Sequence, residues 1–92
     1  MIIGISWFQP AQWERLLEIS EDREELDDSY EDWRKNASRT IEQMALQGQK
    51  VIKVQIDLDD LEFWCYENKL PINGQSRSQY VSHLLHRNNV KR

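Results

Sequence analysis

Ninety-two residues with 39% hydrophobic content suffice for one small folded domain and are too few for two. The single cysteine excludes an internal disulfide and favours a reducing cytoplasm. The apolar run in the opening stretch MIIGISWF is too short for a signal peptide or a membrane span. We therefore expect one domain over residues 1–92 in a cytoplasmic, bacterial protein that does not enter a membrane.

The two halves of the chain differ in charge. Residues 1–48 carry eleven acidic and five basic side chains, a net charge of −6. Residues 49–92 carry five acidic and seven basic side chains, a net charge of +2. The acidic half repels phosphate, whereas the mildly basic half tolerates it. The simplest interpretation of the acidic half is a solvated surface.

The first part of the chain predicts a strand followed by a helix. Residues 2–8 are apolar and rich in β-branched side chains, which favours a strand. Pro10 suits the first turn of a helix, and Trp13, Leu16 and Leu17 have helical spacing, so residues 10–20 form the first predicted helix. The acidic run EDREELDD that follows predicts a loop.

A longer helix is predicted from Ser29 to Gly48. Ser29 is a good N-terminal cap, and Gly48 is a typical terminating residue. The helix has one apolar stripe over about five turns. The stripe consists of Tyr30, Trp33, Ala37, Ile41 and Met44.

The second half predicts a strand and two helices. Apolar and polar residues alternate over residues 51–57, which predicts a strand with Ile56 on its buried face. Asp59 caps a helix that runs to Leu70, and Ser76 caps the last helix after an Asn-Gly turn. The buried face of that helix consists of Tyr80, Val81, Leu84 and Leu85.

These elements predict an α+β fold with two short strands and about four helices packed on one side. Trp33, Ile41, Ile56 and Leu84 are expected to share one core. A two-stranded sheet leaves long edges unpaired, so we expect a homodimer.

The order strand, helix, Gly-containing turn and capped helix in residues 51–85 resembles the ribbon-helix-helix family of DNA-binding proteins. In that family, two chains pair their strands antiparallel, and the ribbon enters the major groove. The resemblance implies that Lys53 and Gln55 contact bases, since lysine can bond guanine and glutamine can bond adenine. It places Ser76 and Arg77 on a phosphate at a helix N-terminus.

The sequence departs from that family at two points. Pro71 ends the first helix early, and the density of basic residues is low for a duplex binder. Asp57 either points toward the duplex edge or caps the following turn.

The chain as a whole resembles a family of short uncharacterised bacterial proteins. The residues that carry this resemblance are WFQPAQW, DDSYEDW and WCYENKLPINGQSR, which together span most of the chain. The family implies no catalytic residues.

Other residues with binding or catalytic chemistry favour structural roles. His83 and His86 are spaced for one metal ion but lack further ligands in the sequence, so we expect them at the surface or at the edge of the core. Cys65 has aromatic neighbours and is expected to be a small buried hydrophobe. The four tryptophans are expected to fill the core, with Trp7 and Phe8 partly exposed as an aromatic contact.

The leading functional hypothesis is a non-catalytic protein-interaction module whose acidic half binds a basic partner. The alternative is a ribbon-helix-helix-like DNA-binding transcriptional regulator, and nucleic acid is a partner only in that case. An enzyme is third, and we expect no catalytic residue, cofactor or metal. Pairing of the second strand within the chain would remove the DNA-binding interpretation.

Overall fold

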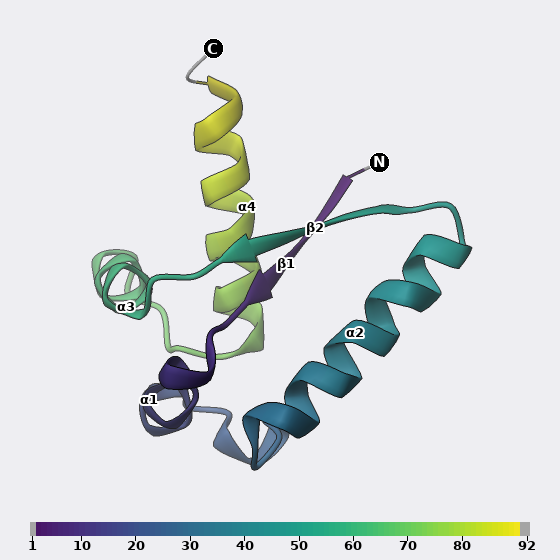
Figure 1. Cartoon of the computed structure of the whole chain (residues 1–92). Helices are drawn as coiled ribbons and strands as arrows, with labels where there is room; N and C mark the ends of the chain where they lie inside the picture. The colour runs from purple at the N-terminus through teal and green to yellow at the C-terminus, as the bar shows by residue number, and fades with distance from the viewer. Residues whose placement is uncertain (1, 91–92) are drawn as a thin grey trace.

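The computed structural model of the chain describes residues 2–90 (Figure 1). Within these residues there are two strands and four α-helices, which confirms the α+β class. In chain order they are β1 (Ile2–Trp7), α1 (Trp13–Ile19), α2 (Tyr30–Leu46), β2 (Lys50–Gln55), α3 (Leu58–Glu67) and α4 (Gly74–Val90). Short 3-10 helices, η1 (Pro10–Gln12) and η2 (Arg23–Glu25), precede α1 and α2. None of the helices in residues 2–90 is both long and apolar enough to cross a membrane.

The predicted limits of α2 are confirmed. The Ser29 hydroxyl accepts a hydrogen bond from the Asp32 N–H at 3.1 Å, so this side chain caps the helix start. After Leu46 the chain turns through Gly48, whose φ of 84° lies in the left-handed region that glycine adopts without strain.

The starts of α3 and α4 differ from the predicted ones. Asp57, not Asp59, caps α3, because its carboxylate accepts hydrogen bonds from the N–H groups of Asp59 and Asp60 at 2.9 and 3.2 Å. β2 therefore ends at Gln55. At α4 the cap is Asn73: its side chain accepts from the Ser76 N–H, and Ser76 Oγ accepts from the Asn73 N–H, as in a capping box.

The two strands pair in parallel within the chain. The register runs from Ile2 opposite Lys50 to Trp7 opposite Gln55. Residues 8–49, which include α1 and α2, form the long connection that a parallel pair requires. The antiparallel pairing of two chains that the ribbon-helix-helix resemblance implied is not the pairing found for these strands.

Helices lie on both faces of the sheet, whereas the sequence predicted helices on one side only. A Cβ built on Gly4 would lie 2.6 Å from Leu85 and 2.8 Å from Val81, so α4 packs directly on that face. Side chains alternate between faces along a strand, so Trp7 projects from the opposite face. There its ring centroid is 4.8 Å from that of Trp33 in α2. Figure 1 shows the strands between α4 and α2.

The main core lies where α1, α3 and α4 meet the ends of the strands. Ile56 is buried in it, and Trp33 and Leu84 pack against it, as predicted. Ile41 is only half-buried and lies outside this core, which α2 contacts through Tyr30 and Trp33 near its start. Cys65 is a buried free cysteine, as expected. The buried residues of the core are Phe8, Trp13, Leu16, Ile56, Leu58, Leu61, Cys65, Tyr80 and Val81.

Candidate functional site

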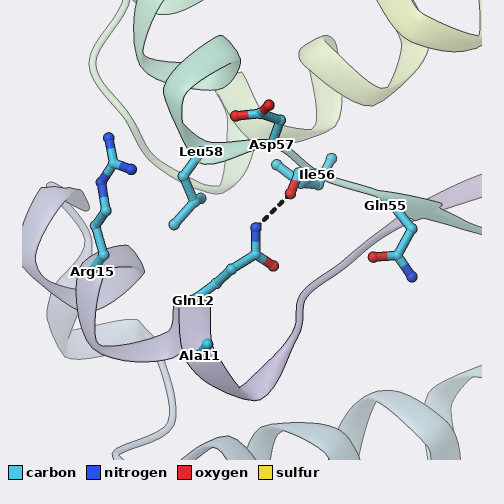
Figure 2. Close-up of a pocket in the computed structure, with 7 residues that line it drawn as sticks. All are labelled: Ala11, Gln12, Arg15, Gln55, Ile56, Asp57 and Leu58. Carbon is cyan, nitrogen blue, oxygen red and sulfur yellow. Dashed lines mark hydrogen bonds between the residues drawn. The ribbon is translucent and has the colours of Figure 1, made fainter.

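An open groove of about 530 Å³ lies at the C-terminal end of β2, between η1 and the start of α3 (Figure 2). In open sheets with parallel strands, ligands bind beyond the C-terminal ends of the strands, so this is the expected place for a site. The groove is lined by Ala11, Gln12, Arg15, Gln55, Ile56, Asp57 and Leu58.

Glutamine side chains join the two walls of the groove. Gln12 donates a hydrogen bond from Nε2 to the Ile56 carbonyl at 2.7 Å, the contact drawn in Figure 2. Gln9 donates from Nε2 to Gln55 Oε1 at 2.8 Å. These bonds tie η1 to the end of β2, so the groove offers polar, hydrogen-bonding walls.

The charged groups of the groove are engaged inside the chain. Arg15 forms an ion pair with Asp59 at 2.5 Å and a second one with Glu62. The hydrogen bonds to these carboxylates raise the pKa of the guanidinium above its usual value. Asp57 caps α3. The lining residues include no histidine, cysteine or hydroxyl side chain, and Asp57 is the one carboxylate among them.

Lys53 and Gln55 project together from one face of β2, as the DNA-binding hypothesis required, and both are exposed. Each has a contact within the chain. The Lys53 ammonium lies 4.2 Å from the centroid of the Trp7 ring, and Gln55 accepts a hydrogen bond from Gln9. The strand that carries them pairs with β1.

Ser76 and Arg77 are buried, which contradicts their predicted place at a phosphate. The Arg77 guanidinium donates to both carboxylate oxygens of Asp22, at 3.2 and 2.7 Å, and to Ser20 Oγ at 3.2 Å. Asp22 also accepts from the Gly74 N–H, the first of α4, at 3.0 Å. A carboxylate of the chain itself thus occupies the anion site at this helix N-terminus.

The environment of Asp22 favours its charged form. Burial alone raises the pKa of the carboxyl group, but the hydrogen bonds and the positive charge of Arg77 outweigh burial and lower the pKa below its ordinary value. The pair therefore holds a full negative and a full positive charge at neutral pH. No local pattern in the acidic run 21–28 distinguishes Asp22 from its neighbours.

Trp7 and Phe8 are buried, so their predicted role as an exposed aromatic contact is wrong. The Phe8 ring lies against Trp13 and Trp33, and the rings of Trp7 and Trp33 also touch. These ring contacts join the end of β1 and the start of α1 to α2, and they remove Trp7 and Phe8 from solvent.

The exposed aromatic residues are instead Phe63 and Tyr66 on α3, with 63% and 79% of their surface accessible. They are three residues apart and lie away from the buried stripe of α3, which consists of Leu58, Leu61 and Cys65. This helical spacing was visible in the sequence and was the signal that could have identified them.

His83 and His86 are both exposed. The His83 ring lies 5.6 Å from the Trp64 ring, between centroids, on the surface of the α3–α4 pair. Among the described residues, no three His, Cys, Asp or Glu side chains converge as metal ligands.

Comparison of the chain with protein-family models, with curated proteins and with solved structures finds no match.

Proposed function

We propose that the protein is a non-catalytic interaction module that binds a basic partner protein. The observation that carries the proposal is the charge of residues 14–32, here called the acidic segment. It holds ten acidic and two basic side chains, a net charge of −8, and eight of the ten acidic side chains are exposed. Such a surface attracts cationic partners and accelerates their association.

The basic residues of the acidic segment do not neutralise its outer surface. Arg15 is turned toward α3, where it pairs with Asp59 and Glu62. Arg23 pairs with Asp28 at 3.1 Å. The carboxylates of Glu18, Glu24 and Glu25 remain exposed for a partner.

Phe63 and Tyr66 provide an apolar contact next to this charge. Arg15 joins α1 of the acidic segment to α3, the helix that presents the two rings. Exposed aromatic side chains are enriched among the residues that contribute most to protein–protein binding. Arginine side chains of a partner would also gain from lying over such rings.

The proposal is tested with a lysine- and arginine-rich peptide, and an acidic peptide of equal length serves as the comparison. We expect binding of the basic peptide only, with an affinity that falls as salt is added. The double variant Glu18→Gln/Glu25→Gln should weaken binding by about two- to thirtyfold, since each exposed charge contributes about 0.2–1 kcal/mol.

The matched control is Glu42→Gln/Glu67→Gln, which changes the net charge equally at exposed positions outside the acidic segment. It should leave the affinity within about twofold of wild type. Equal losses in both double variants, or no preference for the basic peptide, would refute the assignment of the surface.

The buried free thiol of Cys65 suits a reducing cytoplasm, where we place the protein. We do not pursue the DNA-binding alternative further, because β2 pairs with β1 within the chain. Ser76 and Arg77 are also engaged, with Asn73 and Asp22. An enzyme is the third hypothesis, because the charged side chains of the groove, Arg15 and Asp57, are engaged in ion pairs and in a helix cap.

A further inference from the structure

The outer edge of β1 presents main-chain groups without partners. The Ile56 N–H donates to the Trp7 carbonyl at 3.2 Å, so the main chain of Trp7 faces β2. Main-chain groups in a strand alternate in direction, so Ile3 and Ile5 also face β2, whereas Ile2, Gly4 and Ser6 face outward. Within residues 2–90 these outward N–H and carbonyl groups meet no hydrogen-bonding partner.

The two edges of the sheet differ in their protection against a further strand. β2 carries Lys50 and Lys53, and lysine is a common means of keeping an edge strand unpaired. β1 is six residues long and has no charged residue and no proline. Ile2, at its start, has 56% of its surface exposed. An edge with these properties is usually paired or covered in a native protein.

Charge and surface area favour a second copy of the chain as the occupant. Residues 1–13 contain no charged side chain, so two copies meet there without the repulsion that their net charges of −4 would otherwise cause. The chain exposes 6564 Å², whereas a compact protein of 11.1 kDa exposes about 5,700 Å². The excess is close to the roughly 800 Å² that each partner buries in a standard interface.

Part of this excess exposed surface lies beside the outer edge of β1. Ile3 and Ile5 on β1, and Ile41 and Met44 on α2, are only partly buried and do not pack on the main core. They lie on the face of the sheet that α2 covers. A second copy at the β1 edge would cover this partly exposed apolar surface.

We propose that β1 pairs antiparallel with β1 of a second copy, around a two-fold axis at Gly4. Gly4 then lies opposite Gly4 of the second copy, and Ile2 lies opposite Ser6. All of the outward main-chain groups find partners in this register, with about six hydrogen bonds. The two sheets become one four-stranded sheet with helices on both faces, the usual setting for parallel strands. The contact is self-complementary, as a two-fold interface requires.

The oligomeric state tests the proposal directly. Sedimentation at micromolar concentration should give twice the chain mass of 11.1 kDa. Hydrogen exchange of the wild-type protein should show protected amides at Gly4 and Ser6, and this protection should disappear on dilution. A monomer at all concentrations, or a dimer in which both amides exchange freely, would overturn the proposal.

A pair of proline variants locates the interface. Ser6→Pro removes an outward N–H of β1, and Val51→Pro removes an outward N–H of β2, the opposite edge. Ser6→Pro should weaken dimerisation at least about tenfold, because the two-fold axis makes each dimer lose two main-chain hydrogen bonds. Val51→Pro should leave dimerisation unchanged. Tryptophan emission reports whether each variant folds. Equal dimerisation of both folded variants would contradict the proposal. If a variant does not fold, the hydrogen exchange of Gly4 and Ser6 in the wild-type protein tests the interface instead.

This inference is independent of the proposed function. The β1 edge lies outside the acidic segment, and binding of a basic peptide does not require a dimer. A monomer that still binds the basic peptide would overturn the dimer and leave the proposed function intact.

Discussion

Replacing Asp22 by asparagine removes the negative charge that faces Arg77 at the start of α4. The two side chains are only 12% and 10% exposed. Asp22 accepts two hydrogen bonds from Arg77 and one from the Gly74 N–H. The variant leaves the arginine charge buried without its counter-ion. An uncompensated buried charge lowers the stability of the fold strongly.

The expected loss of stability is about 3–5 kcal/mol, the range measured when one partner of a buried pair is removed. A small domain has a free energy of unfolding of about 5–15 kcal/mol, so the change removes a large part of the total. The change in the free energy of unfolding is measured by urea unfolding, with tryptophan emission as the signal, since the chain has four tryptophans.

The stability that the Asp22–Arg77 pair contributes depends on pH in a defined direction. The pKa of Asp22 is lower in the folded chain than the ordinary value of about 3.9. Its contribution to stability is therefore complete above about pH 4 and is lost as the pH falls through the lowered pKa. The difference between wild type and Asp22→Asn should be full at neutral pH and should shrink in acid.

Asp28→Asn is the matched control. Asp28 pairs with Arg23 in the same loop, but its side chain is 90% exposed. Its replacement should cost less than about 1 kcal/mol, as for other surface pairs. A loss below about 1 kcal/mol for Asp22→Asn at pH 7, or a loss that does not shrink in acid, would refute the role given to the pair.

Two further predictions concern β2 and the residue that follows it. Ile56→Ala should lower the free energy of unfolding by about 2–5 kcal/mol, because the side chain is 4% exposed within the main core, and a loss below about 0.5 kcal/mol in urea unfolding would contradict this placement. Lys53→Ala should cost about 0.5–1 kcal/mol through the lost contact with Trp7. Fluorescence anisotropy with mixed duplex DNA should show the same weak, salt-sensitive background for wild type and Lys53→Ala. Tight binding that depends on DNA sequence and is lost in Lys53→Ala would instead support the DNA-binding alternative.

Local patterns were sufficient to predict the order and type of the elements. The apolar stripe from Tyr30 to Met44 and the alternation around Ile52 and Val54 follow the helical and strand periods, and these depend only on residues close in sequence. Gly48 and Ser29 marked the limits of α2 for the same reason. Cys65 was expected to be buried because its sequence neighbours are aromatic, and it lies with Leu58 and Leu61 on the buried side of α3.

Helix starts were less predictable where several capping residues occur together. Asp57, Asp59 and Asp60 can each cap a helix, and the backbone geometry at the end of β2 selects the first of them. The same competition between Asn73 and Ser76 was resolved by their reciprocal hydrogen bonds. The groove depends on this junction. Of its lining residues, Gln55, Ile56 and Asp57 were named in advance, each for another role.

Only the tertiary structure decided which distant segments meet. Alternation along a strand is the same in parallel and antiparallel pairs, so the pairing of β2 with β1 could not be read from residues 50–55. Arg77 was expected to face solvent and a phosphate, but its partner Asp22 lies 55 residues away in the chain. Trp7 and Phe8 are hidden by α1 and α2, which fold back over them. Residues near in sequence determine periodicity and capping, whereas burial and charge pairing depend on contacts that form only when the chain packs.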